Sequence, residues 1–296
     1  MRTTAIAYFL ALLVCLLPSS CGEEQLSGES LFDNVAAHRN DFDRWLLNSY
    51  VYAYNVDVKY RLEDIESQMR YNLAPAEMGK AFKLAKLIKH AWFEAYDEVG
   101  GVDFTRSCAP RVIHLVGSSA YEGNGSVQLG TAEGGMKVTL YGVNEIDSLL
   151  TTPDLLNFYY LQTMHHEFTH ILNQKRNYDI DFETISEGNY VQGDWTQLSF
   201  EMAAAAGFVS TYAASEPRED FAEVLSIYVT YTDDEWVALL RFAGSAAAEV
   251  IKRKLGLVKS YMLGSWNIDL EELRRVVQRR TTEIPELDLS LENIAT

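Results

Sequence analysis

Cysteine is scarce in this chain, with three residues in 296, so a disulfide-rich scaffold is excluded as the source of its stability. Positive charge is also in short supply: 25 lysines and arginines face 42 acidic residues, and the formal net charge is −17. Nucleic-acid binding depends on cations that displace phosphate counterions, and attachment to anionic lipid depends on basic clusters, so both are disfavoured. The 48% hydrophobic content is enough for one large core or two modest ones.

The first 20 residues differ in kind from the rest. An early arginine is followed by an apolar run over residues 5–17, which is too short to span a bilayer, and then by small residues. This pattern predicts a signal peptide over residues 1–20. The next residue, Cys21, resembles the acylated cysteine of bacterial lipoprotein signals, although Pro18 stands where leucine is more usual. The alternative is an ordinary secretory peptide cut near the same position.

Lipidation of Cys21 also accounts for the cysteine count. Cys15 would leave with the signal peptide, Cys21 would carry the lipid, and Cys108 would remain as a single thiol. Residues 21–30 carry no hydrophobic pattern and are predicted to form a tether. The acidic residues just after Cys21 resemble a surface-display signal of some bacteria. We therefore expect a lipid-anchored protein of the bacterial outer membrane, at the cell surface or on the periplasmic face.

The sequence after the tether has no internal repeat and no low-complexity tract. The spacing of its hydrophobic residues changes once along the chain. Residues 31–150 mix helical with alternating patterns, whereas residues 151–296 are almost wholly helical in pattern. We therefore expect an α+β fold, with a sheet-containing part and a helical part around one cleft. The elements predicted for the first part are a helix over 31–46, a strand over 54–64, a helix over 75–99 ended by two glycines, a buried strand over 111–117, and a hairpin of strands over 125–130 and 136–142.

Three of the six histidines fall in the segment HHEFTHIL, residues 165–172. Thr152 and Pro153 predict the start of a helix that runs to about residue 174. His166 and His170 share one face of this helix, and two imidazoles four residues apart can hold one zinc ion. Glu167 is rotated by about a hundred degrees from His166, where its carboxylate can act on water as a general base. The positions around the ligands are uncharged, which favours a buried metal site over a solvated patch.

A catalytic zinc usually takes three protein ligands. The extended motif HExxHxxGxxH is excluded, because Asn173 and Arg176 occupy its glycine and its last histidine position. A glutamate on a later helix is the other common solution, and the residues by themselves leave several candidates open: Glu183, Glu187, Glu201, Glu216, Glu219 and Glu223. Pro217 opens a predicted helix, capped by Ser215 or Glu216, in which Glu219 and Glu223 share a face. Its periodicity alone would assign that face to solvent, so it does not decide the choice.

Four sequence blocks carry a family resemblance: YNVDVKYR, HHEFTHIL, NYVQGDW and GFVSTYAASEPREDFAE. Together they resemble the substrate import-associated zinc metallohydrolase lipoproteins of bacteria, over most of the chain after the signal peptide. The spacing from Tyr212 to Glu219 and Glu223 is also similar to that of the lethal-factor-like zinc peptidases. This resemblance implies that Glu219 is the third zinc ligand, that Tyr212 stabilises the oxyanion, and that Glu223 lies in the outer shell and orients a ligand histidine.

The resemblance further implies a zincin-like fold of the gluzincin type and hydrolysis of peptide bonds at the cell envelope, in connection with nutrient import. An outer-membrane importer is the expected partner besides the peptide or protein substrate. The hairpin over 125–142 is the candidate for the edge strand that pairs with an extended substrate. The alternative is a non-catalytic substrate-binding or transporter-accessory lipoprotein with a structural zinc, although such a site has no need of Glu167. Hydrolysis of a non-peptide substrate, such as a modified glycan, is a third interpretation, since fold and metal do not specify the scissile bond.

Overall fold

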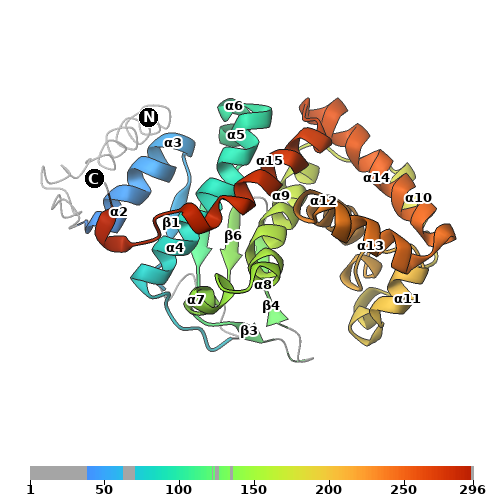
Figure 1. The fold of residues 1–296 in the computed structure, drawn as a ribbon, viewed down its shortest axis with the longest axis horizontal. Coiled ribbons are helices and arrows are strands. Elements are labelled where there is room, and N and C mark those ends of the chain that lie inside the picture. Colours follow the sequence, from blue (N-terminus) through green and yellow to red (C-terminus); the bar gives the residue numbers. More distant parts are fainter. Residues whose placement is uncertain (1–38, 63–70, 122, 124–126, 134–135, 295–296) are drawn as a thin grey trace, which may run out of the picture. The chain divides into compact units, whose positions relative to one another are not determined.

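The computed structural model describes residues 39–62, 71–121, 123, 127–133 and 136–294. The predicted signal peptide, the tether with Cys21 and the first residues of the helix predicted over 31–46 lie outside these ranges. Figure 1 shows the arrangement of the described elements. None of the described helices combines the length and apolar character that a membrane-spanning helix needs.

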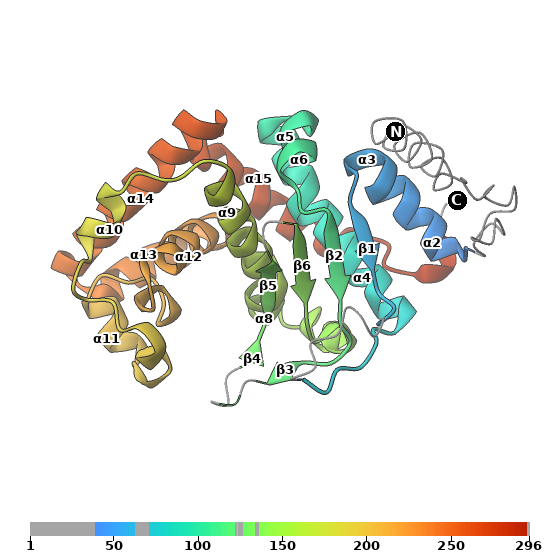
Figure 2. The same ribbon diagram turned by 180° about the vertical axis from the view of Figure 1, so that it is seen from behind.

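A four-stranded sheet lies in the N-terminal half, with the strand order β1-β2-β6-β5 (Figure 2). The strands are β1 (Asp57–Lys59), β2 (Val112–Leu115), β5 (Gly130–Glu133) and β6 (Lys137–Leu140). The central strand β2 pairs in parallel with β1 and β6, whereas β5 pairs with β6 in antiparallel fashion. Ile113 and Leu115 of β2 and Val138 and Leu140 of β6 are buried, as expected for strands in the middle of a sheet. Mixed sheet and abundant helix confirm the predicted α+β class.

The predicted hairpin over 125–142 is only partly right. β6 occupies its second strand, but the first predicted strand is divided between two sheets. Val127 and Gln128 form β4, which pairs with β3 (Ala120–Tyr121) in a separate two-stranded sheet, and β5 begins only at Gly130. Ala132 and Glu133, predicted to lie in the turn, belong to β5. An alternating pattern does not show where a segment changes from one pairing strand to another, because β4 and β5 both have side chains with a period of two.

The edge strand β5 lies against the helix α9 (Thr163–Lys175). They approach closely at Gly130, where an added Cβ atom would come within 2.6 Å of Cγ2 of Thr163. Glycine at this position therefore lets the edge strand approach the helix that carries the histidines. The candidate edge strand is thus β5, the middle portion of the segment expected from the sequence.

The helices of the N-terminal half differ in their bounds from the predicted ones and contain π-helical turns. The helix predicted over 75–99 runs without a break through α4 (Met78–Ile88), a π-helical segment and α5 (Glu94–Gly100), and Gly101 ends it with a φ of 83°. The helix predicted over 31–46 continues past its predicted end, from α2 (Asp41–Leu46) through a π-helical segment to α3 (Tyr52–Tyr54). Two more helices, α6 (Val102–Cys108) and α7 (Ile146–Leu149), flank the sheet strands in the sequence.

After β6 the described part of the chain contains helices but no strand. The helix predicted to start at Pro153 is continuous from α8 (Pro153–Leu156) through π-helical residues 157–162 into α9. Thr152 occupies the position before it, but its side chain makes no capping hydrogen bond, contrary to the prediction. The later helices are α10 (Asp181–Ile185), α11 (Phe200–Ala205), α12 (Pro217–Thr230), α13 (Asp233–Ala243), α14 (Ser245–Trp266) and α15 (Leu270–Thr282).

One hydrophobic core connects the sheet-containing and helical parts. Phe168 of α9 packs edge-on against Trp92 and Tyr96, with ring centroids 5.0 and 4.8 Å apart. All three rings are almost fully buried. Edge-to-face packing of this kind adds about 0.5–1.5 kcal/mol per pair beyond the burial itself. The helix that carries the histidines is therefore held rigidly from its rear face.

Candidate metal centre

The histidine face of α9 packs against α12, and these two helices lie side by side (Figures 1 and 2). α12 opens with Pro217, which is suited to the first turn because it has no N–H to leave unpaired. Glu216 occupies the N-cap position, but no side chain caps the helix, so the predicted cap by Ser215 or Glu216 is wrong. Glu219 and Glu223 lie one turn apart on the face of α12 that meets the histidines.

Three side-chain atoms converge between the helices. Oε2 of Glu219 lies 2.9 Å from Nε2 of His166 and 3.2 Å from Nε2 of His170, and the two Nε2 atoms are 3.1 Å apart. The geometry therefore brings His166, His170 and Glu219 together as one potential metal-binding cluster.

These separations fit a tetrahedral metal ion. Ligand bonds of about 2.0–2.1 Å arranged tetrahedrally place neighbouring ligand atoms roughly 3.3 Å apart, close to the 2.9–3.2 Å observed here. Two imidazole nitrogens and one carboxylate oxygen are also a typical catalytic zinc set, in which the fourth position is left to water or substrate. When both rings carry their proton on Nδ1, the two Nε2 lone pairs face this gap, and one cation there can bind both.

The charges around the cluster favour a bound cation. Burial disfavours a charged ring, but hydrogen bonds and negative charge from Glu219 and Glu223 outweigh it and raise the pKa of His166 well above its ordinary value. Burial likewise opposes ionisation of Glu219, but hydrogen bonds and charge from His166 and His170 hold the pKa of its carboxyl group far below the usual range. The shifts show that negative charge gathers around the two rings, which favours a positive charge at this position.

A second layer of hydrogen bonds orients His166. Oε1 of Glu223 lies 2.8 Å from Nδ1 of His166, and the hydroxyl of Ser210 donates to Oε2 of the same carboxylate at 2.7 Å. Ser210 is itself fixed by the backbone N–H of Ala213, which donates to its Oγ at 2.9 Å. Glu223 therefore contacts the far side of one ligand ring, whereas Glu219 reaches both Nε2 atoms. This difference favours Glu219 as the third ligand and Glu223 as its outer-shell partner.

Glu167 and Tyr212 flank the cluster. Glu167 is buried on α9, and its negative charge acts on both His166 and Tyr212. The Tyr212 ring lies 5.8 Å from the His166 ring and 5.0 Å from that of Trp195. Partial burial, together with the charges of Glu219 and Glu167, raises the pKa of Tyr212 well above its ordinary value. Its hydroxyl therefore stays protonated and can donate a hydrogen bond.

The other histidines and glutamates considered from the sequence lie outside this cluster. His165 is buried behind it, with Nδ1 3.1 Å from the hydroxyl of Tyr96, and burial lowers its pKa to about 3, in keeping with a packing role. Glu183 accepts a hydrogen bond from Tyr178, and Glu201 is exposed at the start of α11. Among the described residues, the His166, His170 and Glu219 group is the one that could hold a metal ion.

The sequence analysis did not predict a buried ion pair next to Glu219. Asp220 and Lys254 are both fully buried, with Oδ2 and Nζ 2.6 Å apart. Lys254 also donates to the backbone oxygen of Gly207 at 2.9 Å, and Tyr190 donates to Asp220 at 3.0 Å. The pair ties the first turn of α12 to α14 and thereby positions Glu219. A signal existed in the sequence, since Lys254 interrupts the apolar stripe of α14 at a buried position.

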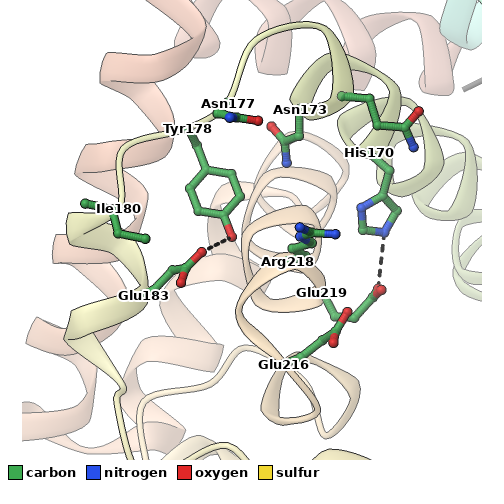
Figure 3. Close-up of a pocket in the computed structure, with 10 residues that line it drawn as sticks. His170, Asn173, Asn177, Tyr178, Ile180, Glu183, Glu216, Arg218 and Glu219 are labelled. Atoms are coloured by element: carbon green, nitrogen blue, oxygen red, sulfur yellow. Dashed lines mark hydrogen bonds and ion pairs between the residues drawn. The ribbon is translucent and has the colours of Figure 1, made fainter.

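The cluster opens on one side into a pocket of about 540 Å³, whose lining includes His170 and Glu219 (Figure 3). Asn173 near the end of α9, Tyr178 in the segment between α9 and α10, and Arg218 at the start of α12 form part of the remaining wall. This volume is within the range of pockets that accept a small ligand or a substrate side chain. A substrate group can therefore be seated next to the metal ligands.

Comparisons with known proteins agree with this geometry. A family model described as "Putative zinc-binding metallo-peptidase" matches residues 35–271. The chain is also similar to a solved structure from Bacteroides caccae, described as "a putative zinc-binding metallo-peptidase". The two are 48% identical, the TM-score is 0.74, and the match covers 88% of this chain and 99% of that one. A comparison with curated proteins gave no match.

Proposed function

Since this chain belongs to the family described as "Putative zinc-binding metallo-peptidase", we propose that it is a peptidase of the gluzincin type with a zincin-like fold. The family and the donor cluster confirm the predicted zinc cofactor. One observation carries the proposal: two Nε2 atoms and one carboxylate oxygen converge beside the buried carboxylate of Glu167. A purely structural site would need no general base at that position.

In this proposal His166, His170 and Glu219 hold the metal, and Glu223 keeps the His166 ring in place through Nδ1. A bound zinc ion supplies Lewis-acid chemistry, since it polarises a carbonyl group and acidifies water. Glu167 takes the proton of the attacking water and passes it to the leaving amine. Tyr212 remains protonated and donates a hydrogen bond to the oxygen on which negative charge develops.

The edge strand β5 supports a peptide as the substrate. Among the described strands it pairs only with β6, so its other edge is available for main-chain hydrogen bonds. It also lies against α9, which carries the proposed base and two ligands. An extended peptide added to this edge would lie alongside the cluster with its carbonyl groups accessible.

Two measurements test the proposal. Metal analysis by mass spectrometry is expected to find about one zinc per chain in the purified protein and little in His166→Ala. The zinc-loaded protein is then expected to cleave members of a peptide library, and Glu167→Gln to bind zinc but not to cleave. Zinc binding without any cleavage that depends on Glu167 would overturn the peptidase assignment and favour the substrate-binding lipoprotein.

The location in the cell is also part of the proposal. Lipidation of Cys21 would anchor the enzyme to the outer membrane, where hydrolysis of captured peptides could serve an outer-membrane importer. Metabolic labelling with a fatty acid should mark the wild-type protein and not Cys21→Ala. Protease treatment of intact cells distinguishes the two faces of the membrane, because a surface enzyme is degraded and a periplasmic one is spared.

A further inference from the structure

The pocket beside the metal cluster contains one cationic side chain, Arg218, which the proposed mechanism does not use. Arg218 directly precedes the proposed ligand Glu219, and in Figure 3 it lies between Tyr178 and His170. Arg218 is exposed and makes no hydrogen bond or ion pair within the described residues. Arg280 on α15, by contrast, forms ion pairs with Glu94 and Glu98. In a chain of net charge −17, Arg218 is a cation beside the metal cluster that no acidic side chain neutralises through an ion pair, and it is free to bind an anionic group.

Two further features of the same wall favour a negatively charged ligand. The first turn of α12 carries no side-chain cap, so the positive end of the helix dipole faces the region of Glu216 and Arg218. Asn173 adds an amide from α9: both polar atoms of its side chain are buried and have no hydrogen-bond partner in the described structure. The Asn173 amide lines the same pocket and can donate a hydrogen bond to a ligand there once its side chain turns toward it.

Two other acidic residues, Glu183 and Glu216, also line the pocket. Glu183 already accepts the hydroxyl proton of Tyr178 at 3.0 Å, and the Tyr178 ring is stacked on Phe221 with centroids 4.5 Å apart. Glu216 is exposed at the N-cap position. Arg218 is the residue of the pocket that carries a permanent positive charge, and its planar guanidinium group matches a carboxylate.

We propose that this pocket binds a carboxylate group of the substrate next to the scissile bond, with Arg218 as its cation and the Asn173 amide as a further donor. The carboxylate can come from the free C-terminus of a peptide or from an aspartate or glutamate side chain. The first source would make the enzyme a carboxypeptidase, the second an endopeptidase selective for acidic residues. The inference rests on the proposed peptidase function, since it concerns the substrate of the same site.

The test measures binding separately from cleavage. Fluorescent peptides of one core sequence, cleaved by the wild-type protein, are prepared in four forms: a free C-terminus, an amidated C-terminus, an amidated form with glutamate beside the scissile bond, and an amidated form with lysine there. Their affinities for zinc-loaded Glu167→Gln are measured by fluorescence anisotropy, alone and combined with Arg218→Gln, Arg218→Lys or Arg253→Gln. Arg253 is an exposed arginine on α14 outside the pocket and controls for the loss of one positive charge.

We expect at least one carboxylate peptide to bind roughly tenfold or more tightly than the neutral amide, as a charge-assisted hydrogen bond provides. With Arg218→Gln, the affinities of the carboxylate peptide and the neutral amide should differ by no more than about twofold. Arg218→Lys should keep part of the preference for the carboxylate peptide, and Arg253→Gln should keep all of it. A preference confined to the free C-terminus or to glutamate identifies the source and supports the proposal.

Equal binding of the carboxylate and amide peptides, or a preference that survives Arg218→Gln, would overturn it. Tightest binding of the lysine peptide would also overturn it, because the acidic residues would then dominate the pocket. These binding outcomes can be told apart from failure of the peptidase proposal. That proposal fails if no cleavage depends on Glu167.

Discussion

Replacing Lys254 with methionine removes the partner of a fully buried carboxylate while keeping most of the side-chain volume. In the native fold the Asp220 carboxylate receives the ammonium of Lys254 at 2.6 Å and the hydroxyl of Tyr190 at 3.0 Å. Burial raises the pKa of Asp220 to about 6 even with the lysine present, so this pKa lies only slightly below neutral pH. After the substitution it must either stay charged with one hydroxyl as its donor or take up a proton at a cost in free energy.

Breaking one partner out of a buried pair costs about 3–5 kcal/mol of unfolding free energy. For a domain of this size, each kcal/mol lowers the melting temperature by about 2–4 °C, so a decrease of roughly 6–20 °C is expected. Because Asp220 adjoins Glu219, the affinity for zinc should fall as well, by about tenfold or more. Urea denaturation, thermal melting and zinc competition against a chelator measure the three effects.

The neighbouring Lys252 provides a matched control. It lies on the same helix and pairs with Glu249 at 2.8 Å, but both side chains are more than half exposed. Lys252→Met should therefore cost less than about 1 kcal/mol and leave zinc affinity unchanged. Adding Asp220→Asn to Lys254→Met removes both buried charges and should recover part of the stability. Equal losses for the Lys254 and Lys252 variants would refute the idea that the buried pair holds α12 in place.

Three further predictions concern the metal centre. Glu219→Ala should lose stoichiometric zinc while Glu223→Ala keeps most of it, and the reverse order of zinc content would exchange their roles. Removal of zinc by a chelator should lower the melting temperature, since a ligand at a thousandfold excess over its dissociation constant contributes about 4 kcal/mol of stability; an unchanged melting temperature would mean that the metal does not bind the folded protein preferentially. Tyr212→Phe should reduce kcat by about 10²–10³-fold with unchanged zinc content, as expected for loss of an oxyanion donor. An unchanged kcat would assign the oxyanion contact to another group.

The sequence alone determined the features that depend on near neighbours in the chain. The four-residue spacing of His166 and His170 implies a shared helix face whatever the tertiary structure, and Pro153 marks the start of that helix correctly. The presence of strands in the first part and the helical second part also followed from periodicity. Local spacing is sufficient in these cases because backbone geometry alone relates residues a few positions apart.

Tertiary structure decided what depends on distant residues. Six glutamates were open as the third ligand, and only the packing of α12 on α9 places Oε2 of Glu219 against both Nε2 atoms. The Asp220–Lys254 pair joins residues 34 positions apart in the sequence, and charge patterns do not show which charges will meet inside a core. The division of the predicted strand between β4 and β5 likewise depends on which neighbours form hydrogen bonds. Periodicity records which face of an element is apolar, whereas long-range packing decides whether a polar face, such as that of Glu223 on α12, is also buried and against which partner.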